Sequence, residues 1–497
     1  MKLRRLLISV SFLMSVLLLP AKDFPKMEAL FSIQDMIGAD ILENNELTAE
    51  ELFSLSLRFS ECDENSPVGL RCRQKFQKIK KEVTSREYKS MGVEERGRAI
   101  LKLLYRDYLK TYDFNQTRID VALESGVYNC VSSALLYMAA AKSASLNVRG
   151  QKTTEHAFCT VYEDAPEAGK AVKKFDVETT NPYGFNPGSK EAIDNEANIK
   201  RYYIVPKKYY ANREEVNDVI FAGLIAGNIC SYYLKENDFE KALPLGATRY
   251  ETALTVTPAY SKALKGIRRD FDVIASNYVN LMKPAALEGA QNIEWYTSFI
   301  DRWSMTDYLQ KNIDNLFNNF LAACYTEKQY SLASAEFEKN KKYLSQKIIT
   351  KSEIALIDIY ITTNIDPLPS EKQIEKIEAL VGSDKFSTQE QQKRILSYLE
   401  NAWLINLGTY MTSGDFESGY HKAKDVLEKL PQSQKIKRLE KAFYDNCIAI
   451  IHNNFVVPAN SGRYEEARQI LEEGLQKYPD DKTLKSDLTA LEKLTTD

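Results

Sequence analysis

The chain has 497 residues, of which 44% are hydrophobic and 27% charged, and these proportions are typical of a soluble globular protein. Its length exceeds that of one ordinary domain and predicts two or three. The formal net charge of −3 gives no electrostatic reason to expect nucleic acid or an anionic membrane as a partner. Seven cysteines are too few for a disulfide scaffold of this size.

Residues 1–21 have the pattern of a secretory signal peptide. Three basic residues precede an apolar run over 6–19, which is short for a membrane span and typical of a signal-peptide core. Cleavage after Ala21 fits, although Leu19 is larger than the residue preferred two positions earlier, and an uncleaved anchor is the alternative. We therefore predict an exported protein of the periplasm or cell envelope, with no membrane span after cleavage.

Residues 22–92 are predicted to form a helical lead-in. Helices are expected over 27–43 and 48–60, the second with a capping box of Thr48 and Glu51, and a basic helical segment follows over 71–90.

Cys62 and Cys72 flank a short polar stretch that contains a proline and a glycine. In an oxidising compartment they could form a disulfide. Two free thiols are an equal alternative.

Residues 93–212 are predicted to mix helices and strands. Helices are expected over 93–112, 117–124 and 130–146, and the last is apolar on most sides, which indicates a buried central helix. Alternation over two segments separated by turn residues predicts a β-hairpin, and one further short strand is expected. These three extended segments are 156–162, 175–179 and 201–205.

Cys130 is the first candidate for chemistry. Gly126 and Asn129 indicate a turn, so Cys130 is expected at a helix N-terminus, where free backbone N–H groups and the helix dipole stabilise a thiolate. A buried structural cysteine is the alternative.

His156 is the second candidate, because it alone of the three histidines lies in the strand region. His421 and His452 are on expected tail helices with no reactive neighbours. Cys159 alternates to the opposite face of the strand from His156 and is expected in the core.

The hairpin turn predicts which carboxylate lies beside His156. A turn centred on Pro166 would place Asp176 directly opposite His156, with Cβ atoms roughly 5 Å apart. Asp176 would then orient the imidazole, which in turn would activate Cys130. Glu178, two residues further along, lies on the same face of the strand as Asp176 and is the alternative carboxylate for this role.

The segments that carry these residues resemble the transglutaminase-like superfamily: Asn129-Cys130-Val-Ser-Ser, Glu155-His156-Ala157-Phe158 and Phe175-Asp176-Val-Glu-Thr-Thr-Asn. The resemblance implies an α+β fold with a papain-like core, in which a helix bearing the cysteine packs on an antiparallel sheet. It also implies that Cys130 is the nucleophile, His156 the general base and acid, and Asp176 the orienting group. Members of the superfamily include peptidases, amide-cleaving enzymes and cross-linking acyltransferases.

Support for an oxyanion is the weakest part of this site. Many members of the superfamily have a tryptophan near the nucleophile, whereas no tryptophan of this chain precedes Trp295. Tyr128 is the nearest aromatic substitute, although a packing role fits it better. Backbone N–H groups near Cys130, with help from Asn129, are expected to serve instead. No metal or cofactor motif was found, and we predict none.

Residues 213–497 are predicted to be helical, with no strand pattern. A turn-and-helix signature recurs in which an aromatic residue is followed three positions later by a small residue. This pattern resembles the second helix of a tetratricopeptide repeat, although the spacing departs from that family's period of about 34 residues. An unrelated α-helical domain is the alternative. The four copies begin at Asn237, Lys328, Gly414 and Gly462, of which the second is weaker.

Together these features predict an exported thiol-dependent amide hydrolase or acyltransferase whose helical repeats bind a protein or peptide partner. The alternative is a catalytically inactive envelope scaffold or binding protein. A thiol redox role is disfavoured because the chain has no Cys-x-x-Cys pair.

Overall fold

The computed structural model describes residues 24–36, 46–163, 172–187, 212–256, 261–280 and 285–496. The expected signal peptide, the turn at Pro166 and the strand over 201–205 lie outside these ranges, as does most of the second half of the expected helix over 27–43. The chain divides into two compact units: Met1–Lys283 with Gln291–Asn312, and Pro284–Ala290 with Ile313–Asp497.

The α+β fold class expected from the sequence is wrong. Helices make up 71% of the structure and strands only 6%, so the protein is mainly helical and does not have a papain-like α+β core as its fold class. The two expected extended segments that fall within the described ranges were found in roughly the right places, but the strands in those ranges are short and form a two-stranded and a four-stranded sheet. Helices form most of the remaining chain, so the fold class is mainly helical.

The helix expected over 27–43 is wrong over its described part, 27–36, where only a three-residue 3-10 helix forms, whereas the helices expected from residue 48 onward begin and end close to their predicted positions. The first of them starts after Thr48, whose side chain and that of Glu51 form the predicted capping box. Cys72 lies inside the second helix, and both Cys62 and Cys72 are buried free thiols. A short 3-10 helix, η1 (Ile33–Asp35), precedes the set: α2 (Ala49–Phe59), α3 (Pro67–Val83), α4 (Arg86–Ser90), α5 (Val93–Asp107) and α6 (Ile119–Ser125).

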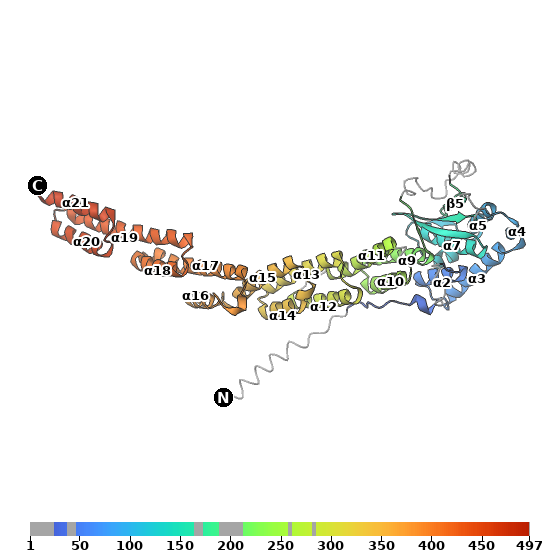
Figure 1. Ribbon diagram of the computed structural model, residues 1–497, viewed down its shortest axis with the longest axis horizontal. Coiled ribbons are helices and arrows are strands. Elements are labelled where there is room, and N and C mark those ends of the chain that lie inside the picture. Colours follow the sequence, from blue (N-terminus) through green and yellow to red (C-terminus); the bar gives the residue numbers. More distant parts are fainter. Residues whose placement is uncertain are drawn as a thin grey trace, which may run out of the picture. The chain divides into compact units, whose positions relative to one another are not determined.

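Helix α7 (Cys130–Ser143) is the predicted buried central helix of the first unit (Figure 1). Every residue from Cys130 to Ala141 is buried. Helices α2, α3, α5 and α6 pack against it, and one face of the larger sheet covers another side. The apolar composition on all sides of this segment therefore reflects contacts in all directions.

The larger sheet is antiparallel, with the order β5-β4-β3-β6. Strands β3 and β6 were not expected, since neither shows a clear alternation of apolar and polar residues. At Gly150 of β3 a Cβ atom would lie 2.3 Å from the ring of Phe221, so only glycine allows the helix that carries Phe221 to approach so closely. The strands are β3 (Asn147–Lys152), β4 (Ala157–Tyr162), β5 (Lys174–Val177) and β6 (Glu214–Val216), and a separate parallel pair joins β1 (Thr111–Tyr112) to β2 (Val127–Tyr128).

Helices continue the first unit after the sheet. The first of them packs on α2, α7 and β3, so the helices that directly follow residue 213 belong to the same compact unit as the sheet. Pro244 lies inside the second of them, as expected from its position in the sequence. These helices are α9 (Asp218–Glu236), α10 (Phe239–Ala253), α11 (Ser261–Asn280), α12 (Ala286–Trp303) and α13 (Asp307–Thr326), and the last two cross the division between the units.

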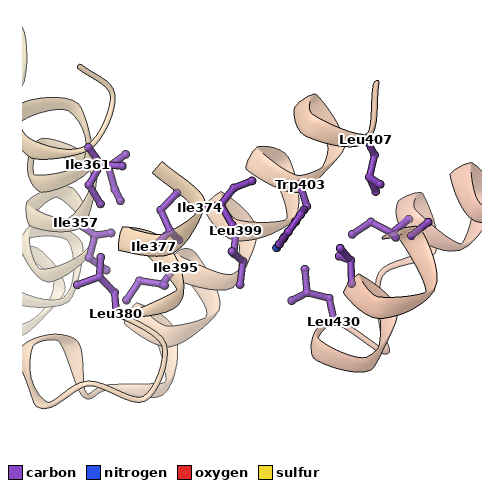
Figure 2. Close-up of a cluster of buried hydrophobic side chains, with 14 of the residues drawn as sticks. Ile357, Ile361, Ile374, Ile377, Leu380, Ile395, Leu399, Trp403, Leu407 and Leu430 are labelled. Carbon is purple, nitrogen blue, oxygen red and sulfur yellow. The ribbon is translucent and has the colours of Figure 1, made fainter. Parts of the chain in front are cut away.

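The second unit is a series of helical hairpins. Figure 2 shows part of its core, where one long helix carries Ile395, Leu399, Trp403 and Leu407 in a row at four-residue spacing. The elements are α14 (Tyr330–Asn340), η5 (Lys341–Tyr343), α15 (Gln346–Asn364), α16 (Ser370–Glu378), η6 (Asp384–Phe386), α17 (Gln389–Ser413), α18 (Phe416–Lys429), α19 (Gln434–Asn460), α20 (Tyr464–Lys477) and α21 (Lys482–Thr496).

All four copies of the turn-and-helix signature have the same backbone geometry. The first residue of each copy has a positive φ: 57° at Asn237, 56° at Lys328, 78° at Gly414 and 73° at Gly462. The aromatic residue then begins a helix, and the small residue three positions later packs closely against a neighbour. The turn-and-helix signature therefore marks the same local backbone structure at all four places in the chain, including the weaker copy. The small residues are Ala242, Ala333, Gly419 and Ala467.

No helix within the described ranges is long and apolar enough to cross a membrane.

Candidate functional site

The start of α7 is held in place by the residue that precedes it. The side-chain oxygen of Asn129 accepts hydrogen bonds from the backbone N–H groups of Val131 (2.9 Å) and Ser132 (3.1 Å). In return, Ser132 Oγ accepts one from the Asn129 backbone N–H at 3.0 Å, which completes a capping box. Cys130 is thus the first helical residue, as predicted. Among the described residues, no acceptor binds its own backbone N–H.

Upstream of this helix, a tight turn requires glycine. Gly126 ends α6 with a φ of 78°, and a Cβ atom there would lie 2.8 Å from the carbonyl oxygen of Tyr108. The turn leads the chain into β2 and then directly into the capping box of α7.

His156 lies at the end of the turn between β3 and β4, and its ring interacts with the side chain of Cys130. Its own backbone is fixed by Thr153. The His156 N–H donates to Thr153 Oγ1 at 3.0 Å, and the His156 carbonyl accepts from the Thr153 N–H at 2.8 Å. Only 8% of Cys130 and 7% of His156 are exposed. The structure therefore brings the two predicted residues together in a nearly buried position.

Glu178 is the carboxylate that binds His156. Its Oε2 lies 2.7 Å from His156 Nε2, and the residue is 2% exposed. Its other oxygen, Oε1, accepts hydrogen bonds from the Thr180 N–H (3.1 Å) and hydroxyl (2.6 Å). Because Glu178 occupies Nε2, we infer that Nδ1 is the ring nitrogen that faces Cys130.

The prediction that Asp176 orients His156 is wrong. In the observed register Asp176 lies opposite Thr160 of β4, four residues beyond His156. Asp176 accepts a hydrogen bond from Thr160 at 2.8 Å and pairs with Arg213 at 2.6 Å. The assumed centre of the turn misplaced the register. Because the error in register is an even number of residues, Asp176 and Glu178 remain on the predicted face of the sheet. Glu178, the alternative carboxylate, is therefore the one that reaches the imidazole.

The pKa of His156 reflects these contacts. Burial alone would disfavour the charged imidazolium, but the hydrogen bonds to Cys130 and Glu178 and the charge of Glu178 outweigh this effect and raise the pKa of His156 to about 10. The ring is therefore protonated at neutral pH, and it places a positive charge next to the sulfur of Cys130.

Tyr128 and Asn129, the two expected supports of an oxyanion, have other roles. Tyr128 is fully buried, and its hydroxyl lies 2.9 Å from that of Tyr105 and 3.4 Å from the carbonyl of Thr180. The amide of Asn129 caps α7 and donates to the carbonyl of Phe114 at 3.2 Å. The backbone N–H of Cys130 is the better candidate donor, as the sequence also suggested.

The remaining cysteine and histidine candidates do not join this cluster. Cys159 is fully buried on the α7 face of the sheet, with its Sγ 3.5 Å from the carbonyl of Ala134, and burial raises the pKa of its thiol. His421 lies against Tyr420, and His452 pairs with Asp487 at 2.7 Å, both in the second unit. No group of three potential metal ligands occurs in the part of the chain that the structure describes.

Sequence reasoning missed the hydroxyl groups that support the site. Thr153 fixes His156, Thr180 fixes Glu178, and Thr179 is 2.8 Å from Ser133, one turn into α7. The run Glu178-Thr-Thr carries a partial signal, since a carboxylate followed by two hydroxyl residues often binds them locally. Thr153 gave none, because strand β3 was not expected.

Comparisons with known proteins do not show a family. No protein-family model matches the chain. No curated protein matches it either. Among solved structures, the crystal structure of menin, which reveals the binding site for the Mixed Lineage Leukemia protein, is a weak match. It has 13% sequence identity and a TM-score of 0.34, and the match covers 76% of this chain and 83% of that chain. At this level of similarity, menin is no guide to the function of this protein.

Proposed function

We propose that this protein is an exported thiol-dependent amide hydrolase or acyltransferase, in which Cys130 is the nucleophile, His156 the general acid and base, and Glu178 the orienting group. One observation carries the proposal: the buried ring of His156 is hydrogen-bonded to Glu178 and interacts with the side chain of Cys130. A nucleophile, a base and a group that orients the base are the minimum set for covalent acyl transfer. The proposal depends on these side chains and not on a family fold.

In the first step the thiolate of Cys130 attacks the carbonyl carbon of an amide and forms a tetrahedral intermediate. The C–N bond then breaks, the imidazolium of His156 gives its proton to the leaving amine, and a thioester remains. In the second step a water molecule gives a proton to His156 as it attacks the thioester. The C–S bond then breaks, the carboxylic acid leaves and the sulfur is released as a thiolate, while the proton taken from water stays on His156.

The start of α7 supplies the electrostatic part of this chemistry. The charge that develops on the carbonyl oxygen needs donors near the sulfur, and the Cys130 N–H has no acceptor within the described ranges. The positive end of the α7 dipole acts in the same direction.

Hydrolysis is the preferred outcome over transfer to an amine. Water is small enough to reach a nearly buried sulfur atom without a dedicated pocket, whereas an acyl acceptor requires a second binding site, and no feature of the sequence indicates one. The helical hairpins of the second unit would bind the protein or peptide partner of the enzyme. Export follows from residues 1–21.

The second candidate is a binding protein without catalysis. The low exposure of Cys130 and His156 favours it, because a substrate must reach a sulfur atom that is now only slightly accessible.

Alkylation with iodoacetamide across pH, followed by mass mapping of the labelled cysteine, separates the two candidates. If the proposal holds, Cys130 reacts at pH 6 at least about tenfold faster than an ordinary thiol, and His156→Ala removes this advantage. Cys159, which is fully buried, remains unlabelled in the folded protein and serves as an internal control. A Cys130 that is sluggish at pH 6 and unaffected by His156→Ala leaves the binding protein as the function.

A further inference from the structure

A groove of about 750 Å³ lies in the second unit, where α18 and α20 both pack on α19. It is lined by the start of α18, one side of the second half of α19, and the length of α20. All three helices belong to one compact unit, so the groove is defined without reference to the rest of the protein. Its volume suits a few peptide side chains.

Aliphatic side chains line the groove along α19. Ile450 is 44% exposed and Val457 is 61% exposed, both unusually open for such residues. They are seven residues apart and therefore on one side of the helix, about 10 Å from each other. Two open aliphatic positions at this distance can hold two apolar side chains of a bound segment.

A buried hydroxyl adds a polar anchor. Tyr478 lines the groove and is only 6% exposed. No hydrogen-bond partner with normal geometry is found for its Oη among the described residues, and the polar group it interacts with is the weakly bonding thiol of Cys447. Such an unsatisfied hydroxyl costs free energy unless a ligand binds it. A backbone carbonyl of a bound peptide would accept its hydrogen bond.

The charges of the groove favour a basic ligand. Four carboxylates and two cations line it, a balance of −2. Both cations are already engaged, since Lys477 pairs with Glu417 at 2.7 Å and Arg463 pairs with Glu466 at 2.7 Å. The carboxylate that remains most available for a ligand is that of Glu473, whose only hydrogen-bond partner in the described ranges is the neutral amide of Gln469.

We propose that this groove binds an extended segment of another protein that carries two aliphatic side chains about 10 Å apart with Lys or Arg beside them. The inference rests on the proposed partner-binding role of the helical repeats and gives it a place and a chemistry. In a chain of polyproline II conformation, with three residues per turn and a rise of about 3.1 Å per residue, side chains three residues apart lie on one side at about this separation.

The test is fluorescence anisotropy with labelled octapeptides and the full-length protein. The first probe has two leucines three positions apart with lysine and glycine elsewhere, the second replaces lysine by glutamate, and the third replaces leucine by serine. We expect the first probe to bind at least about tenfold more tightly than either of the others, with affinity falling as salt is added.

Variants locate the binding. The double variant Ile450→Ser/Val457→Ser should weaken binding of the first probe at least about tenfold, and Tyr478→Phe and Glu473→Gln should each weaken it several-fold. Ile405→Ser on α17, at a position that is 70% exposed but outside the groove, is the matched control and should change nothing. Circular dichroism shows whether each variant is folded.

Equal binding of the three probes, or equal binding by the groove variants and the Ile405→Ser control, overturns the proposal. A change of oligomeric state in Ile450→Ser/Val457→Ser without peptide binding by the parent protein also overturns it, since the occupant would then be a second copy of the chain. Alkylation of Cys130 is measured separately, so failure of the groove and failure of the catalytic proposal are distinguishable.

Discussion

Glu178 lies 2.7 Å from His156, with its Oε2 facing Nε2 of the ring, and both side chains are almost completely buried. A buried carboxylate is stable only when it is paired or hydrogen-bonded, and here each of its oxygens has partners. The pair therefore supplies both the orientation of the imidazole and a large part of the interaction that keeps it protonated.

Glu178→Gln should lower the alkylation rate of Cys130 at pH 6 by about 10-fold or more, because the neutral amide no longer stabilises the imidazolium. Asp176→Asn is the matched control. Asp176 lies on the same sheet face but binds Thr160 and Arg213, so the alkylation rate of Cys130 in Asp176→Asn should stay within about twofold of the parent rate. If Asp176→Asn slowed alkylation of Cys130 more than Glu178→Gln did, Asp176 would be the orienting group instead.

The elevated pKa of His156 makes the stability of the fold depend on pH. A group whose pKa rises on folding, here from 6.5 to about 10, stabilises the folded state fully below about pH 6.5, and this contribution is lost as the pH rises through about 10. The difference in unfolding free energy between the parent and His156→Gln should therefore shrink from pH 7 to pH 10 in urea denaturation.

Nuclear magnetic resonance checks the same titration directly. The chain has three histidines, so His→Gln variants assign their ring signals. A His156 signal that titrates near pH 6.5 would contradict the elevated pKa.

The local features of the site could be predicted from the sequence, but its long-range pairing could not. The helix start at Cys130 is predicted by the capping residue Asn129, and the sheet face of His156 and Glu178 is predicted by the alternation of side chains along a strand. Each of these features depends only on residues close by in the chain. The register of β4 and β5 depends on where the connecting turn closes, and turn residues alone misplaced it by four positions. The choice between Asp176 and Glu178 depended on that register.

The fold class failed for a related reason. Alternation of apolar and polar residues is clear in two short segments. The α+β fold class was predicted from those segments, although helices form most of the chain. The repeated hairpins of the second unit were predicted better, since each is a local structure. Their aromatic residue, small residue and turn lie within a few positions of one another, as at Gly414, Phe416 and Gly419.

Asn129→Ala should destabilise the first unit by about 1–2 kcal/mol, because two N–H groups at the start of α7 lose their acceptor in a buried place. It should also slow alkylation of Cys130. Asn129→Asp, which keeps the capping oxygen, should recover most of the stability. Equal stability of the parent and Asn129→Ala in urea denaturation would show that the cap has no energetic role.

Gly419→Ala should destabilise the second unit by about 1–3 kcal/mol, because the added methyl would lie 2.5 Å from the buried ring of Phe443. Gly408→Ala is the control within the same unit. A Cβ atom at Gly408 meets nothing within 4 Å, and the substitution should stabilise helix α17 by about 0.5–1 kcal/mol. Thermal unfolding that responds alike to the two changes would contradict close packing at Gly419.

Lys328 tests whether the weaker copy of the repeat is a real member of the series. It has a φ of 56° at the position where the two strongest later copies have glycine, and a side chain in this region costs roughly 1 kcal/mol. Lys328→Gly should therefore raise the unfolding free energy of the second unit by up to about 1 kcal/mol. The converse change, Gly462→Lys, should lower it by a similar amount, since the turn there has nearly the same geometry. Urea denaturation of the two variants should show shifts of opposite sign, and a destabilised Lys328→Gly would exclude Lys328 from the shared turn.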